Sequence, residues 1–198
     1  GLEALDSPRR GICSTTGMGF AVPLTALVLG LAAPSAAVSQ ATDSAALAAV
    51  ASTCAGATSA GGDEHSRLEA MYCGINIVRR AYSLHVVRGN TPLNRSSLLK
   101  ADAVRRCGFS HTPCGMAFSR TFRTAGYLPA RAFGENLAWG QGEYGSPVHA
   151  LQLWLNSPPH RKNLLGGRWR DLGIAFERGR MFGRDGVALW VMQFGRRR

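Results

Sequence analysis

The segment from Gly145 to Leu165, GSPVHALQLWLNSPPHRKNLL, constrains the fold most, because two prolines interrupt a short amphipathic helix. Pro147 suits a first helical position, and Ser146 can cap that turn. The apolar residues recur at three- and four-residue spacing, which places on one face Val148, Leu151, Trp154 and Leu155. Proline disfavours helical backbone in the preceding residue, so the helix ends before Pro158. The pattern predicts a buried helix, then a short turn capped by Ser157 that holds His160 in place.

Other elements follow from capping and periodicity. Ser66-x-x-Glu69 is a capping box at the start of a long first helix that ends by Gly89. A second helix is expected from Ser96 or Ser97 to residues 107–108, and a short third helix over residues 116–126. Residues 172–177 and 187–194 alternate as strands, joined by a hairpin over residues 179–186, whereas residues 133–139 are left as strand or turn. Late antiparallel strands among helices indicate an α+β fold.

Several motifs, taken in order, resemble the CAP superfamily of cysteine-rich secretory proteins, antigen 5 and pathogenesis-related proteins. Residues 154–165 match W-x-x-S-P-x-H-R-x-N-[IL]-[IL], as written in bacterial SCP-like extracellular proteins. Further matches are the N-x-x-R of Asn76 and Arg79, residues 91–93, 109–111 and 126–127, the GENLAWG of residues 134–140, and the closing segments 172–175 and 190–195. The likeness covers residues 68–195, and its pieces are specific in combination.

The resemblance implies an α-β-α sandwich with an antiparallel sheet between helical layers, formed by residues 66–198. It also implies that His111, Glu135 and His160, which stand where the family places its central polar residues, meet in one cleft. Asn76 and Arg79 would tie the first helix to a neighbouring loop. The remaining motif positions expected to shape the cleft or support it are Asn136, Trp154, Ser157 and Asn163.

Two imidazoles and a carboxylate form a competent ligand set for zinc or another divalent metal. Glu135 is the candidate general base; alternatively it orients a histidine ring from behind. Ser157 stands where eukaryotic members carry a second glutamate, which weakens the case for paired-carboxylate catalysis. His149, His65 and His85 match no motif, and no serine lies in a nucleophile-elbow context.

Residues 20–33, FAVPLTALVLGLAA, form an apolar run of signal-peptide size that ends in small residues. Residues 1–37 are therefore predicted to be a leader cleaved after Ala37, with Met18 as an alternative start. The run is short and broken by proline, which favours a signal peptide over a membrane anchor. Residues 38–65, rich in Ala, Ser, Gly and Thr, are predicted to be a flexible linker. The protein is expected to be secreted or held in the cell envelope.

Four cysteines follow the leader, an even number that suits disulfides in an exported chain. Of the three possible pairings we favour Cys54–Cys73, which pins the linker to the first helix, and Cys107–Cys114, which closes a loop around His111. Free buried thiols are the alternative. The cysteine spacings do not form the paired knuckle of a zinc finger.

The net charge of +11 comes almost entirely from arginine, since only Lys100 and Lys162 are lysines among 23 basic residues. GC-rich coding is one explanation, and adhesion to anionic cell wall or phospholipid is another. Nucleic acid is disfavoured because no interleaved aromatic residues offer a stacking platform. Nothing in the sequence indicates an oligomeric state.

Three functions remain open at this point. The first is a binding module whose cleft takes a small ligand, lipid or cell-wall component, with or without a divalent metal. The second is a metal-dependent hydrolase of peptide or envelope substrates that uses Glu135 as base. The third is a structural envelope protein in which the same residues form a polar packing network.

Overall fold

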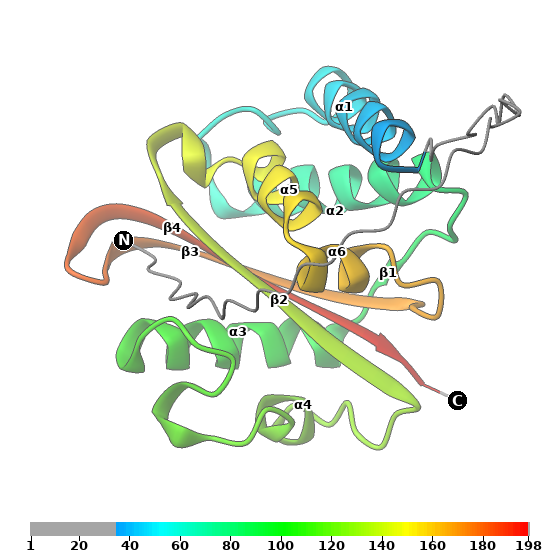
Figure 1. The fold of residues 1–198 in the computed structure, drawn as a ribbon. Coiled ribbons are helices and arrows are strands. Elements are labelled where there is room, and N and C mark those ends of the chain that lie inside the picture. Colours follow the sequence, from blue (N-terminus) through cyan, green and yellow to red (C-terminus); the bar gives the residue numbers. More distant parts are fainter. Residues whose placement is uncertain (1–34, 198) are drawn as a thin grey trace, which may run out of the picture. The chain divides into compact units, whose positions relative to one another are not determined.

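The computed structural model describes residues 35–197 of the chain, which form one compact unit (Figure 1). Its α-helices are α1 (Ser35–Thr53), α2 (Glu64–Ala81), α3 (Thr91–Cys107), α4 (Arg120–Thr124), α5 (Pro147–Asn156) and α6 (Pro158–Leu164). Its strands are β1 (Arg88–Gly89), β2 (Ala132–Gln141), β3 (Asp171–Met181) and β4 (Arg184–Arg196). None of the helices in this part of the chain is long and apolar enough to cross a membrane.

The four strands form one sheet in the order β1-β3-β4-β2. The three long strands are antiparallel, as predicted, but the two-residue β1 pairs with β3 in parallel and makes the sheet mixed. The β3–β4 connection is tighter than the expected loop over residues 179–186. Met181 pairs with Arg184 across Phe182 and Gly183, which both have positive φ (55° and 73°), as the favoured two-residue hairpin turns require.

Both faces of the sheet are buried, which confirms the α+β sandwich. Along β4, one set of alternate residues packs into the core shared with α1, α2 and α5: Ala188, Trp190, Met192 and Phe194. The intervening residues Val187, Leu189 and Val191 pack against Ala101 and Val104 of α3. Figure 1 shows α3 and α4 on one side of the sheet and α1, α2 and α5 on the other. Strand β2 is left at one edge of the sheet.

Two helices begin earlier than their serines suggest. Asp63 caps α2, where its carboxylate accepts from the backbone N–H of Ser66 at 3.0 Å, so the predicted capping box at Ser66 is wrong. Asn90 caps α3 in the same way, accepting from Leu93 N at 3.2 Å. Ser96 and Ser97, expected as caps, lie buried inside that helix. Asp and Asn are N-caps as good as serine, and each of these two satisfies a free N–H of the first turn where its helix begins.

Residues 35–53 are helical, so the prediction of a flexible linker over residues 38–65 is wrong for this segment. Helix α1 packs into the core through Ala46 and Val50. Its Asp43 accepts a hydrogen bond from Tyr82 Oη at 2.6 Å and an ion pair from Arg161 at 2.6 Å. The alanines that suggested a linker are small enough to let α1 lie close to α2. The predicted cleavage after Ala37 falls in the first turn of α1, and the rest of the leader lies outside the described residues.

Both predicted disulfides are present. Cys54–Cys73 joins the end of α1 to α2 with a Cα–Cα distance of 5.8 Å, and Cys107–Cys114 closes the loop that carries His111 with a distance of 5.2 Å. The free-thiol alternative is therefore excluded for these four cysteines. The second bridge fixes the end of α3 close to the short 3-10 turn Pro113–Gly115. It therefore restricts the backbone of the loop that carries His111.

Asn76 and Arg79 tie α2 to neighbouring loops, as expected. The Asn76 side chain donates to Val87 O at 3.1 Å and accepts from Val87 N at 2.9 Å. Arg79 is buried and donates to His85 O at 2.9 Å, Leu164 O at 2.8 Å and Gly166 O at 3.1 Å. Leu164 is the last residue of α6 and Gly166 follows it closely, so Arg79 holds in place the end of the helix that carries His160.

Candidate functional site

The candidate site is assembled over the edge strand β2, where the two helical layers meet. His111 comes from the loop after α3, Glu135 from β2, and His160 from α6 on the opposite layer. The His111 and His160 ring centroids lie 6.4 Å apart. His111 Nδ1 lies 2.9 Å from Glu135 Oε1. The three side chains therefore converge as predicted, whereas their role as metal ligands stays a prediction.

Glu135 is buried and held on all sides. Its Oε2 accepts from Gln193 Nε2 at 2.8 Å, and its Oε1 faces both His111 and the ammonium of Lys100, which is 3.4 Å away. The side chains of Glu135 and Lys100 are both 0% exposed, whereas that of His111 is 47% exposed. Glu135 thus orients the His111 ring from behind. Because its side chain is fully buried and both oxygens already have partners, water in the cleft does not reach it, and the geometry does not favour it as general base.

His160 is fixed from two directions. Its Nδ1 lies 2.7 Å from the hydroxyl of Ser157, and its carbonyl accepts from Asn136 Nδ2 at 2.9 Å. Ser157 makes no capping bond to α6, contrary to expectation, because its hydroxyl is used by the imidazole. Burial, and secondarily the nearby His111, lowers the pKa of His160. This direction favours the neutral form of the ring, whose Nε2 is the nitrogen not bonded to Ser157.

The remaining motif residues build the frame behind the two histidines. Asn163 donates to Glu135 O at 3.0 Å and to Asn136 Oδ1 at 3.1 Å, which joins α6 to β2. Trp154 is buried and donates from its indole to Leu137 O at 3.0 Å, which joins α5 to the same strand. Asn136, Trp154 and Asn163 consequently have structural roles in fixing the helices on β2.

The donor set fits a metal ion poorly. A tetrahedral zinc bonded at roughly 2.0–2.1 Å to both free Nε2 atoms would bring the ring centroids to about 5 Å, compared with the observed 6.4 Å. Glu135 is fully buried, and its Oε1 already faces the ammonium of Lys100, which disfavours it as a third ligand. Within residues 35–197, no group of three or more His, Cys, Asp or Glu side chains is arranged to hold an ion.

An apolar groove of about 280 Å³ lies beside His160. Its lining is aromatic and aliphatic apart from His160 and Ser157, and it includes Phe109, Leu137, Ala138, Trp139, Leu153 and Trp154. Phe109 and Leu153, exposed at 44% and 42%, lie together in this lining. The groove thus combines an accessible apolar wall with the polar atoms of His160 and Ser157.

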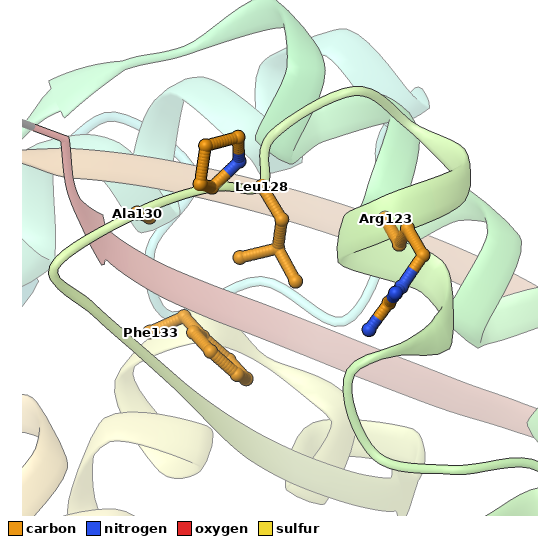
Figure 2. Close-up of a pocket in the computed structure, with 5 residues that line it drawn as sticks. Arg123, Leu128, Ala130 and Phe133 are labelled. Atoms are coloured by element: carbon orange, nitrogen blue, oxygen red, sulfur yellow. The ribbon is translucent and has the colours of Figure 1, made fainter.

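A second cavity, of about 430 Å³, lies beside α4. Figure 2 shows Arg123, Leu128 and Phe133 around it, with the guanidinium of Arg123 on the helix side. Phe133 stacks on Phe118 at 5.8 Å between ring centroids, and Phe118 in turn contacts His111 at 6.2 Å. An aromatic cluster therefore separates this cavity from the histidines, and we do not assign it to the same site.

Sequence reasoning missed two buried members of the site, Lys100 and Gln193. Lys100 had a detectable signal, because it shares a helix face with the apolar Leu93 and Val104 at helical spacing. Gln193 had no such signal, because one amide in an apolar strand usually indicates an exposed position or an edge strand.

The model of the cysteine-rich secretory protein family (CAP) matches residues 74–194. The chain belongs to the CAP family. This agrees with the motif order and with the sandwich described above. A search of curated proteins found no match to the chain.

Solved structures show the same CAP fold. An extracellular protein containing an SCP domain from Bacillus anthracis str. Ames is 24% identical over 68% of this chain and 41% of its own length, with a TM-score of 0.55. An outer surface protein from Borrelia burgdorferi is 19% identical over 69% of this chain and 97% of its own length, with a TM-score of 0.59. A cysteine-rich secretory protein from Staphylococcus aureus subsp. aureus Mu50 is 15% identical over 68% and 40%, with a TM-score of 0.52.

This CAP chain thus spans about two fifths of the length of the Bacillus and Staphylococcus proteins. The likeness to all three solved structures is one of fold, and a shared fold does not by itself transfer an activity.

Proposed function

We propose that this protein is an extracellular CAP module that binds an amphiphilic ligand, with an acyl chain in the groove and a polar head group at His160 and His111. The observation that carries the proposal is the apolar groove with an imidazole and a hydroxyl in its wall. Ligand sites are mostly apolar with a few convergent polar groups, and range over roughly 300–1,000 Å³. A groove of about 280 Å³ suits part of a chain rather than a whole lipid.

The extracellular location is supported by three features. The two disulfides are of the kind that persists in oxidising compartments. The apolar run at residues 20–33 has signal-peptide character. Similar solved structures are described as extracellular, outer surface and secretory proteins. The net charge of +11 further favours the anionic surface of a cell envelope.

The hydrolase alternative has less support. It needs an activated water within reach of a base, whereas Glu135 is fully buried and both of its oxygens already have partners. The structural alternative is favoured by the same network, because Glu135 is fully partnered as in a packing core. The groove favours the binding role over the structural one, because Phe109 and Leu153 are exposed side by side in a concave apolar surface with polar atoms in its wall.

The test is binding of a fluorescent long-chain fatty acid and of a lysophospholipid to the disulfide-bonded protein. Leu153→Asp should weaken binding at least about tenfold, because a groove wall becomes charged. Leu98→Asp is the matched control: Leu98 is 47% exposed and lies on α3 outside the groove. Preference for one probe separates a carboxylate from a phosphate head group. Absence of saturable binding, or equal loss in both variants, would refute the proposal and leave the structural role.

A further inference from the structure

Lys100 is an unexpected component of the site. It is fully buried on α3, and it is one of only two lysines among 23 basic residues. Its ammonium donates to His111 O at 2.6 Å and lies 3.4 Å from Glu135 Oε1. It also lies 5.4 Å from the centre of the Phe118 ring, within range of a cation–π contact. These three contacts place Lys100 against His111 itself and against two side chains that contact the His111 ring.

The location of this charge bears on what the cleft accepts. The ammonium and the His111 ring share one oxygen of Glu135, so the carboxylate's charge is already neutralised inside the protein. A divalent cation at the free imidazole nitrogens would therefore gain little, because Lys100 offsets the attraction of Glu135. An oxyanion does not depend on an uncompensated carboxylate, because it accepts hydrogen bonds from imidazole N–H groups.

We propose that Lys100 is the resident cation of the site and sets its ligand class. It positions His111 through the backbone carbonyl and Glu135, and it makes the cleft select a carboxylate or phosphate head group over a divalent metal. The head-group half of this inference rests on the proposed function. The exclusion of metal does not, so the two can fail separately.

The first experiment titrates zinc alone into the full disulfide-bonded protein by calorimetry. The wild type should show no zinc binding that depends on His160, judged against His160→Ala. Lys100→Met removes the charge at similar volume, and it should raise zinc affinity at least about tenfold, because a unit charge at such range is only partly screened inside a protein. Adding His160→Ala to Lys100→Met should remove that gain. The matched control Lys100→Met/Glu135→Gln restores the neutral sum and should bind zinc no better than wild type.

Wild-type zinc binding that depends on His160 and is tighter than about 10 μM, or a Lys100→Met variant no tighter than wild type, would overturn the metal exclusion. Should Lys100→Met not fold, the wild-type titration alone decides it. The second experiment uses Glu135→Gln, which leaves the lysine unopposed. It should bind a fatty acid at least about fivefold tighter than wild type, with a fatty alcohol of equal length unchanged. An equal change for both would overturn the head-group half, and no binding of either by wild type would instead reject the proposed function.

Discussion

Replacing Arg79 by methionine should show how much the hydrogen bonds of its buried guanidinium stabilise the fold, apart from the packing of its apolar stem. In the wild type the side chain holds three carbonyls, those of His85, Leu164 and Gly166. Burial, with a smaller contribution from Arg170, lowers the pKa of Arg79 to about 10, so the group is still charged at neutral pH. Methionine fills most of the same space and leaves the three carbonyls without their donor.

The magnitude follows from those three bonds. Leaving a buried acceptor unsatisfied costs about 1–3 kcal/mol, and water reaches part of a loop carbonyl once the side chain shortens. Methionine also escapes the desolvation of a buried charge, which offsets some of the loss. We therefore expect the free energy of unfolding to fall by about 2–4 kcal/mol. Arg80→Met is the matched control, because Arg80 is the exposed next residue of α2 and should change stability by less than about 0.5 kcal/mol.

The assay is equilibrium unfolding in urea with the disulfides intact, followed by tryptophan fluorescence. Because Arg79 holds the end of α6, His160→Ala in the Arg79→Met background should add less destabilisation than in wild type. Equal stability of Arg79→Met and Arg80→Met would refute the reasoning, because it would mean that the three carbonyls find water as easily as they find the guanidinium.

Other predictions follow from single contacts. Burial, then Asp102 and Glu64, raises the pKa of Glu177 above its ordinary 4.5. Stability should therefore fall as pH rises from about 4.5 through the folded-state pKa, and Glu177→Gln should abolish this slope. Parallel pH profiles of the urea midpoint in the wild type and the variant would contradict the assignment. Gly173→Ala should unfold the domain or cost over about 3 kcal/mol by thermal melting, because its Cβ would meet the backbone of Leu93. Replacing Cys107 and Cys114 by serine should cost about 2–3 kcal/mol in urea and broaden the His111 NMR signals; unchanged signals would show that Lys100 alone holds the loop.

Much of the fold could be predicted because its signals are local. The stop at Pro158, the late hairpin and the family motifs fixed the order of elements around the site. The resemblance also placed His111, Glu135 and His160 together, which spacing along the chain could not do. The pairing of both disulfides could also be predicted, because one pins the segment before the first helix to that helix and the other closes a loop around His111.

The errors have physical causes. Helix α1 was mistaken for a linker because its small residues lack a strong apolar stripe, and it is ordered by contacts such as Val50 against Gly74 and Asp43 with Arg161. Caps at Asp63 and Asn90 were missed because several polar residues near each start compete for the same role. The environment of Glu135 was not predictable, since it depends on Lys100 and Gln193 arriving from two other elements.

The two imidazoles belong to different layers of the sandwich, with His111 carried by the α3 side and His160 by α6 on the other side of β2. A ligand that contacts both rings would therefore link the two layers at the edge of the sheet. Because such a ligand binds only when the two layers are packed together, it would raise the unfolding midpoint of the domain as well as reduce the motion of the two side chains. Conversely, any shear between the layers would be registered first as a change in the distance between these rings.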